Sequence, residues 1–236
     1  MKIAFKLGES QIHAVVHQHQ RATPTMLNVH DDEDTSVAAG LANIEQSGGR
    51  VIELVHSGER LITFGLAGKS YSFDPNRIFS DAGICETLKQ HSAYSVAAHA
   101  EIKNFAAEYL HHFALDQEPV IIALHNTMDG IFSVESFTPV GDLGSNSAAI
   151  HISPRRDKFD FFYVTERNFF DYLQRHDFNA VLQDNEKVTE DGSLSVYFAR
   201  QGVPYINIEA DITHLEEQIE MVKVVREMLQ EQSVQR

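Results

Sequence analysis

The sequence predicts one α/β domain in which a mixed, largely parallel central sheet is covered by helices on both faces. Runs of β-branched and aromatic residues alternate with segments of helical periodicity along the 236 residues. The run PVIIALHNT at 119–127 is continuously apolar over most of its length, which is typical of a strand covered on both faces. No repeat, low-complexity tract or linker rich in proline, glycine or serine divides the chain, so residues 1–236 are expected to form a single domain.

The expected elements follow from these two patterns. Strands are expected at 26–29, once or twice within 50–74, and at 119–127, 159–165 and 203–211. Helices are expected at 35–46, 92–113, 167–176 and 212–232. The first of these helices shows the signal plainly, because Val37, Leu41 and Ile44 recur at helical spacing before Ser-Gly-Gly ends the segment.

Composition excludes several classes of protein. Lysine and arginine number 19 against 34 acidic residues, a net charge of -15, so the chain lacks the basic surface that nucleic acids require. The single cysteine, Cys85, excludes an internal disulfide and fits a reducing compartment. The N-terminal segment lacks the long apolar core of a signal peptide, and no run reaches membrane-spanning length. We therefore expect a soluble, cytoplasmic protein that binds neither nucleic acid nor membrane.

Residues that could bind a metal ion stand at the ends of three predicted strands. His30 and Glu33 follow the strand at 26–29, His125 lies near the end of the strand at 119–127, and Glu209 lies in the strand at 203–211. Ligands of open α/β sheets bind beyond the carboxyl ends of strands, so these side chains are expected to meet. Zinc in hydrolases commonly takes three protein ligands and keeps a fourth position open. His30, Glu33 and His125 therefore form a candidate zinc site, provided that the two imidazoles lie close enough to share one ion.

The acidic run at 31–34 fits such a site, because a dication offsets the repulsion between neighbouring carboxylates. Asp31, Asp32 and Asp34 could also hold the ligand imidazoles by hydrogen bonds. Simpler explanations stay open. Asp34 could cap the helix expected from Thr35, and a His-x-x-Glu pair arises by chance in a chain with 13 histidines.

The segment FDPNRIF at 73–79 adds a candidate substrate site. Arg77 offers a planar fork suited to a carboxylate, and the neighbouring amide of Asn76 can hold a second oxygen, although an ordinary polar corner would look the same. In this order, His-x-x-Glu, Asn-Arg, a strand-terminal histidine and a strand-borne glutamate resemble the zinc carboxypeptidase family. The segment DPNRIF and the short chain look more like its aspartoacylase and succinylglutamate desuccinylase branch than like the digestive carboxypeptidases.

The resemblance implies a zinc-dependent hydrolase that cleaves an amide bond next to a carboxylate, in a small molecule or a short peptide. It implies one Zn²⁺ per chain held by His30, Glu33 and His125. Glu209 looks like the general base that activates the zinc-bound water, and Asn76 and Arg77 look like the pair that grips the substrate carboxylate.

Other parts of the family pattern are less closely matched. The family's arginine that polarises the scissile carbonyl corresponds to Lys69 here, with Arg60 the nearest arginine upstream. Arg200 and Tyr197 lie where related enzymes carry further substrate-binding residues, although Tyr197 could equally be a core aromatic residue. The altered arginine position leaves open a non-catalytic metal-binding or carboxylate-binding protein on the same fold, and a protein whose histidines are purely structural is the remaining alternative.

Arg155, Arg156 and Glu209 each have a structural explanation beside the functional one. Arg155 and Arg156 could guard a pocket for an acidic substrate, but they could also be solvated surface residues. Glu209 would be costly to bury without a partner, so it is expected to face a wet cleft or to be paired.

Overall fold

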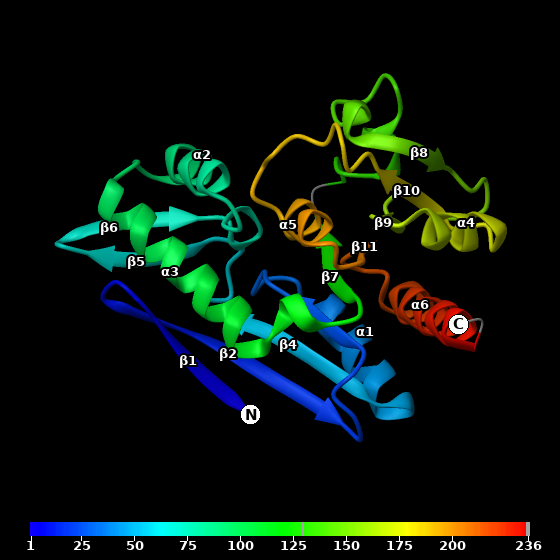
Figure 1. Ribbon diagram of the computed structural model, residues 1–236, viewed down its shortest axis with the longest axis horizontal. Coiled ribbons are helices and arrows are strands. Elements are labelled where there is room, and N and C mark those ends of the chain that lie inside the picture. Colours follow the sequence, from blue (N-terminus) through cyan, green and yellow to red (C-terminus); the bar gives the residue numbers. More distant parts are fainter. Residues whose placement is uncertain (129, 235–236) are drawn as a thin grey trace.

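The computed structural model describes residues 1–128 and 130–234, and within them nine strands form one mixed sheet (Figure 1). In spatial order these strands are β1 (Lys2–Leu7), β2 (Ser10–His19), β4 (Gly49–Val55), β3 (Thr25–Asn28), β7 (Ile121–Thr127), β11 (Tyr205–Asp211), β9 (Phe161–Val164), β10 (Asn179–Gln183) and β8 (Ser147–His151). The four middle strands, β4, β3, β7 and β11, run parallel, whereas antiparallel pairs occur on both sides of them. The prediction of a mixed, largely parallel central sheet is confirmed, with the parallel pairs lying mostly in the middle of the sheet.

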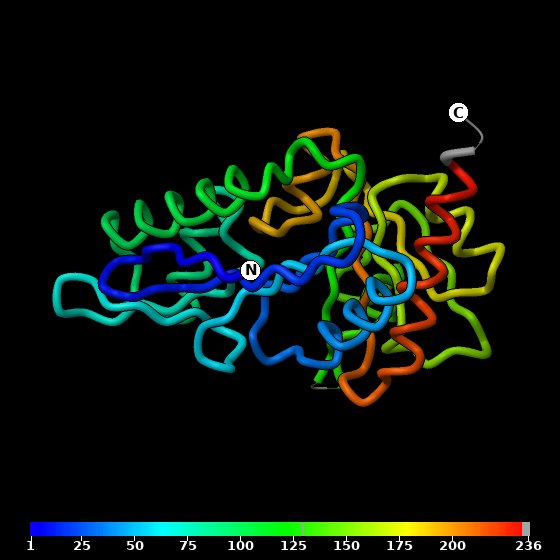
Figure 2. The backbone as a smooth tube through the Cα atoms, turned by 90° about the horizontal axis from the view of Figure 1, so that it is seen from below, coloured from blue at the N-terminus to red at the C-terminus, as the bar shows by residue number. Residues whose placement is uncertain are grey.

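Helices cover both faces of this sheet, as predicted. They are α1 (Asp34–Ser47), α2 (Asp81–His91), α3 (Val96–Phe113), α4 (Arg167–Arg175), α5 (Leu194–Gln201) and α6 (Leu215–Val234). Side chains of β7 alternate between the faces, so that Ile122 and Leu124 pack with α1, α4 and α6, while Ile121 and Ala123 pack with α2, α3 and α5. Figure 2 shows α3 lying along the N-terminal strands.

Segment 50–74 contains three strands, so the prediction of one or two was wrong. After β4, the chain forms a separate hairpin of β5 (Ile62–Leu66) and β6 (Lys69–Phe73), which projects beside α2 (Figure 1). Its core is aromatic, because Phe64 and Phe73 are fully buried with ring centroids 6.0 Å apart. The hairpin itself does not line the cavity described below, but Arg60 in the segment before it and Asn76 and Arg77 in the segment after it do.

The helix predicted at 92–113 begins later, at Val96, because the hydroxyl of Ser95 accepts a hydrogen bond from the Ala98 amide (3.1 Å). The preceding α2 begins in the same way after Ser80, which accepts from the Gly83 amide (3.1 Å). Four short 3₁₀ helices complete the described part: η1 (Pro75–Arg77), η2 (Leu115–Gln117), η3 (Val134–Phe137) and η4 (Gly144–Asn146). Among the described residues, no helix has the length and apolar character needed to cross a membrane.

Candidate metal centre and active site

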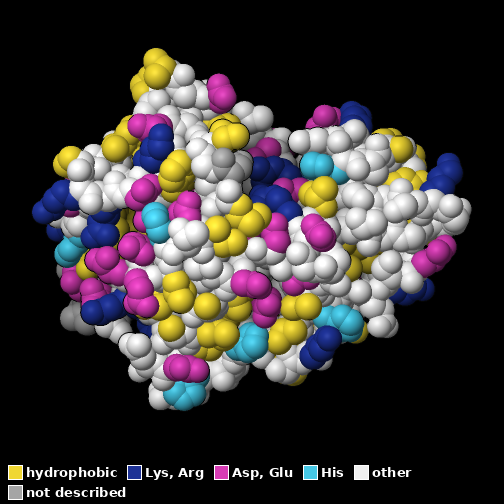
Figure 3. Space-filling view, turned by 180° about the vertical axis from the view of Figure 1, so that it is seen from behind, with side chains coloured by type: hydrophobic (Ala, Val, Ile, Leu, Met, Phe, Trp, Pro, Cys, Tyr) yellow, Lys and Arg dark blue, Asp and Glu magenta, His cyan; other side chains and the backbone are white. Residues whose placement is uncertain are grey.

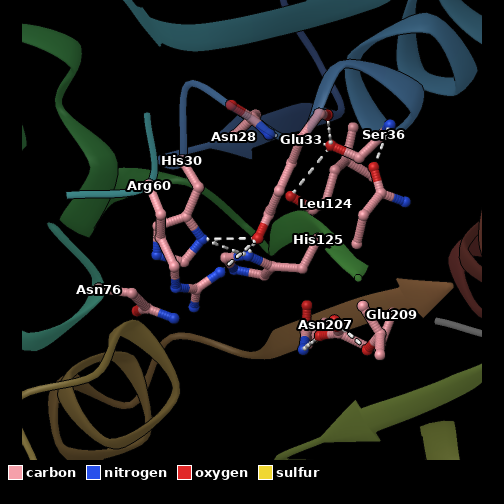
Figure 4. Close-up of polar contacts among 12 residues, drawn as sticks. Asn28, His30, Glu33, Ser36, Arg60, Asn76, Leu124, His125, Asn207 and Glu209 are labelled. Atoms are coloured by element: carbon pink, nitrogen blue, oxygen red, sulfur yellow. Dashed lines mark hydrogen bonds and ion pairs between the residues drawn. The ribbon is translucent and has the colours of Figure 1, made fainter. Parts of the chain in front are cut away.

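The strand order brings the predicted site residues to one edge of the sheet. His30 follows the end of β3, which is paired with β7, and β7 in turn is paired with β11. His125 on β7 and Glu209 on β11 are direct register partners. Figure 4 shows Glu33 pointing between the two imidazoles, with Glu209 on the neighbouring strand. Sheet topology therefore explains why residues distant in the chain converge here.

His30, Glu33 and His125 form a buried cluster with short contacts. The Nδ1 atom of His30 lies 2.8 Å from Glu33 Oε1 and 3.2 Å from His125 Nδ1. His125 Nδ1 lies 3.0 Å from Glu33 Oε2, and the two ring centroids are 5.0 Å apart. The expectation that the imidazoles come close enough to share one ion is met by this geometry.

This donor set fits a divalent metal ion. Zinc bonds of about 2.1 Å in a tetrahedron put ligand atoms about 3.4 Å apart, slightly more than the 2.8–3.2 Å contacts here. All three side chains are buried, and each offers one ligand atom within 4.8 Å of the others. The Nε2 atom of His125 is buried without a hydrogen-bond partner, so Nδ1 is the only nitrogen of that ring with polar contacts among the described residues.

Opposite charges on neighbouring side chains stabilise the cluster. Burial alone would lower the pKa of His30, but the charges and hydrogen bonds of Glu33 and Asp74 outweigh it and raise the pKa to about 9. Burial likewise favours neutral Glu33, but the adjacent His30 and His125 hold the pKa of its carboxyl well below the usual range. The cluster is therefore ionic, with the Glu33 carboxylate beside the His30 imidazolium.

Asp74 supports the cluster and was not predicted to do so. Its Oδ1 lies 2.9 Å from His30 Nε2, so it accepts that N–H and leaves Nδ1 free to face the cluster. Burial opposes ionisation of Asp74, yet the hydrogen bond and charge of His30 lower the pKa of its carboxyl. Asp74 is fixed in turn, because its Oδ1 accepts from the Asn76 amide (2.7 Å). The only signal in the sequence was its position directly before Pro-Asn-Arg.

Arg60 also lies at the cluster. Its Nη1 donates to Glu33 Oε1 (2.8 Å), and its Nε is 3.6 Å from Asp74 Oδ2. Lys69, in contrast, is exposed at the start of β6 and does not line the cavity. Of the two candidates for the carbonyl-polarising cation, the structure brings Arg60 to the site and not Lys69.

Glu209 lies beside the cluster, and two hydrogen bonds hold its carboxylate in place. Its Oε1 accepts from the Thr127 hydroxyl (3.1 Å), and its Oε2 accepts from the Asn207 side-chain amide (3.2 Å). Burial raises the pKa of Glu209, as the Glu33 charge also does, while the His125 charge and these hydrogen bonds oppose the rise. A carboxyl group with a raised pKa next to a candidate metal site is suited to accepting a proton.

The start of α1 fixes Glu33. Glu33 occupies the N-cap position but makes no capping bond, because its carboxylate is turned to the histidines. Asn126 Oδ1 accepts a hydrogen bond from the Ser36 backbone amide instead (2.8 Å).

Gly40 lets α1 approach the sheet, since a Cβ there would lie 2.8 Å from the Leu124 side chain. The alternative that Asp34 caps this helix is not met, because Asp34 is its first residue.

The cluster opens into a cavity of about 540 Å³. His30, Glu33, His125 and Glu209 line it, together with Asn76 and Arg77 from η1. On the face in Figure 3, basic side chains lie in the hollow near the middle of the molecule. Arg77 Nη1 donates to the Asn76 carbonyl (2.7 Å), and Asn76 Oδ1 accepts from the Leu194 amide (3.0 Å). The predicted carboxylate-binding pair therefore faces the same space as the candidate metal site.

Other predicted residues lie elsewhere. Arg200 is largely exposed and paired with Glu190. Tyr197 packs against Phe79 and donates to Asp116 (3.0 Å). Neither side chain lines the cavity, so the structure does not bring these two predicted substrate-binding residues to the site.

The remaining polar candidates also serve other parts of the fold. Arg155 pairs with Asp177 (2.6 Å), and Arg156 with Glu220 (3.2 Å), both outside this cavity. Asp31 accepts from the His56 and Gly58 amides and fixes a loop. No hydrogen bond to a ligand imidazole is found for Asp31, Asp32 or Asp34 within the described residues.

No protein-family model and no curated protein matches the chain. A solved structure from Shewanella amazonensis SB2B, assigned to the succinylglutamate desuccinylase/aspartoacylase family, is similar over 97% of this chain and 72% of its own, with 10% identity and a TM-score of 0.44. A second structure from that organism, assigned as a metallopeptidase, covers 96% and 85% with 12% identity and a TM-score of 0.37. A third, from Shewanella denitrificans OS217 and also assigned as a metallopeptidase, covers 97% and 82% with 12% identity and a TM-score of 0.39. These names agree with the family that the sequence motifs resemble, but likenesses of this size carry no conclusion about activity.

Proposed function

We propose that the chain is a zinc-dependent hydrolase that cleaves an amide bond next to a carboxylate. The supporting observation is the convergence of three buried ligand atoms beside a buried glutamate, in a cavity that also contains Asn76 and Arg77. A metal site alone would support only binding, whereas an adjacent proton acceptor and an anion-binding pair support hydrolysis of an acidic substrate.

Each residue has a role in the proposed reaction. A bound Zn²⁺ would polarise the substrate carbonyl and lower the pKa of a water molecule. Glu209 takes the proton from the attacking water and passes it to the departing amine. Arg77 and Asn76 hold the substrate carboxylate and so orient the amide. Arg60 lies close enough to the cluster to stabilise negative charge that develops on the carbonyl oxygen.

The test is zinc content followed by a substrate screen. Wild-type protein incubated with zinc and then desalted should retain about one ion per chain by elemental analysis, and His30→Ala should lose it. His17→Ala is the matched control, because His17 also pairs with a glutamate (Glu53, 3.2 Å) but outside the three-ligand group. The wild type should then release amine from some N-acyl amino acid or dipeptide. Equal zinc in all three proteins would reject the ligand assignment, and stoichiometric zinc without turnover would indicate a non-catalytic metal-binding protein.

Asp74→Ala is expected to weaken zinc binding by about 10- to 100-fold, because His30 loses the acceptor that orients its ring. Competition with a chelator of known affinity measures this change. Asp31→Ala is the control, since Asp31 binds loop amides and not an imidazole. Equal zinc affinity in wild type and Asp74→Ala would contradict the supporting role of Asp74.

Zinc affinity is expected to rise with pH. The pKa of His30 is about 9 without metal, so below this pH the ion must displace a proton from the ring. Affinity should therefore increase by about tenfold per pH unit between pH 6 and 8. Calorimetry at pH 7 in buffers of different ionisation enthalpy should show release of about one proton. A flat affinity over this range would show that His30 is already neutral.

A further inference from the structure

The cavity has a second, apolar end. Alternate residues of a strand face the same side, and the cavity-lining residues of β11 are Glu209, Asn207 and Tyr205. At about 3.3 Å per residue, Tyr205 lies about 13 Å along the strand from Glu209. Tyr163 on β9 is the register partner of Asn207, which lies two residues before Glu209 on β11. Aromatic side chains therefore line the cavity close to the end that contains Glu209. The cavity thus runs from the ionic cluster into an aromatic region.

The side chains of this aromatic region pack against one another and form one wall of the cavity. The ring of Phe137 from η3 lies tilted against that of Tyr163, with ring centroids 5.0 Å apart, and the ring centroid of Phe132 lies 5.8 Å from that of Phe137. Leu143 packs against the same cluster and completes the wall, together with Val196 from α5. A wall held by neighbouring side chains offers an apolar group a preformed surface, so little ordering opposes binding.

Among the cavity-lining residues that the structure describes, Arg77 is the one lysine or arginine open to a ligand carboxylate. Arg60 and Arg77 are the lysine or arginine residues among the described cavity-lining side chains. Arg60 is engaged by Glu33 and Asp74. Arg77 has only a loose carboxylate partner, because its Nε is 3.8 Å from Asp191 Oδ2, beyond hydrogen-bond distance. A substrate can therefore place one carboxylate here, and a second would lie against apolar side chains at a high desolvation cost.

Arg77 lies at the apolar end, next to the start of α5. Close backbone packing places it there, since a Cβ on Gly192 would lie 2.6 Å from the Arg77 carbonyl oxygen. Ser193, Ser195 and Val196 continue from this loop along the cavity. The part of a substrate whose carboxylate binds Arg77 therefore also places its side chain against the aromatic wall.

We propose that the preferred substrates are amides of an amino acid with a single carboxylate and a bulky apolar side chain, either N-acyl amino acids or peptides that end in such a residue. Amides of acidic amino acids, which bring a second carboxylate to this end, are disfavoured. This inference rests on the proposed function for the reaction, but the binding preference can be measured without turnover.

The test uses zinc-loaded Glu209→Gln, which keeps the cavity wall and Arg77 but lacks the proposed base. Calorimetric titration should show N-acetyl-L-phenylalanine binding at least about tenfold more tightly than N-acetyl-L-glutamate, as burial of a phenyl ring predicts. N-acetyl-L-phenylalaninamide, which lacks the carboxylate, should also bind at least about tenfold more weakly. The ratio of kcat/KM values for the two acids on wild-type protein provides a second measurement if the variant folds poorly.

A charge introduced into the wall should reverse the preference. Leu143→Arg adds a second cation inside the cavity and should shift the ratio towards N-acetyl-L-glutamate by at least about tenfold. Val140→Arg is the matched control: it adds the same charge in the same loop, but Val140 is 96% exposed and does not line the cavity. Glutamate binding as tight as phenylalanine binding, no binding of either acid, or the same shift in both variants would overturn the inference. Tight binding of N-acetyl-L-phenylalanine without hydrolysis by wild type would instead reject the proposed reaction and leave the binding preference standing.

Discussion

Glu209→Gln is expected to lower amide turnover by about 10²- to 10⁴-fold while zinc content stays at the wild-type level. Glutamine keeps the size of the side chain and can still accept the hydrogen bond from Thr127, but it cannot take a proton from water. The loss should appear in kcat, with KM little changed, because Glu209 is not assigned to carboxylate binding. Initial rates on the best amide from the screen and elemental analysis of the same sample measure both quantities.

Asp211→Asn is the control for this substitution. Asp211 lies two residues further along β11, but its carboxylate accepts from the Thr213 amide (2.9 Å) and hydroxyl (2.7 Å) and does not line the cavity. Its turnover should stay within about twofold of wild type. A Glu209→Gln variant that keeps its rate would show that another group transfers the proton.

The convergence of the metal-binding residues could be predicted because it depends on sheet topology. His30, His125 and Glu209 each stand near the carboxyl end of a strand, and parallel neighbouring strands bring such ends together. Asp74 could not be found in this way, because its contact with His30 depends on the path of the chain through the β5–β6 hairpin and η1. Loop paths of this kind leave no periodic pattern in a sequence.

Lys69, Tyr197 and Arg200 show the limit of placing residues by spacing alone. Lys69 follows the turn Ala67-Gly68, where both residues have positive φ, and pairs with Leu66 at the tip of the hairpin. The tip is exposed, so linear proximity to Asn76 does not bring Lys69 to the cavity. On α5, Ser195 and Val196 face the cavity, whereas Tyr197 packs away from it on Phe79. Helix phase decides this difference, and the sequence did not identify α5.

The elements that were not predicted have weak apolar signals. Strand β2 interleaves its buried Ile12, Ala14 and Val16 with histidine and glutamine, and α2 buries only Ile84 and Leu88 among its large apolar residues. Strand β2 lies between β1 and β4 but buries only alternate side chains, and the small helix α2 buries one narrow face, so few positions constrain their sequence. The buried central strands β7 and β11 lie at the opposite extreme and were found within two residues of their observed starts.

Glu33→Ala is expected to lower the free energy of unfolding of the metal-free protein by about 3–5 kcal/mol at pH 7, in addition to abolishing zinc binding. Glu33 is 1% exposed and contacts His30, His125 and Arg60, so its removal leaves the buried His30 imidazolium without its carboxylate partner. Glu53→Ala removes a more exposed carboxylate that contacts only His17, and should lower the free energy of unfolding by less than about 1 kcal/mol.

The effect of Glu33→Ala should depend on pH in a defined direction. Burial would lower the pKa of His30, but Glu33 and Asp74 raise it from 6.5 to about 9. A raised pKa stabilises the folded protein fully below the unfolded value, and this contribution is lost as pH rises through the folded value. The difference in free energy of unfolding between wild type and Glu33→Ala should therefore be larger at pH 6.5 than at pH 9.5, while the Arg60 contact persists at both. Urea denaturation in the presence of a chelator measures this difference, and equal values at the two pH values would show that His30 is not charged in the metal-free cluster.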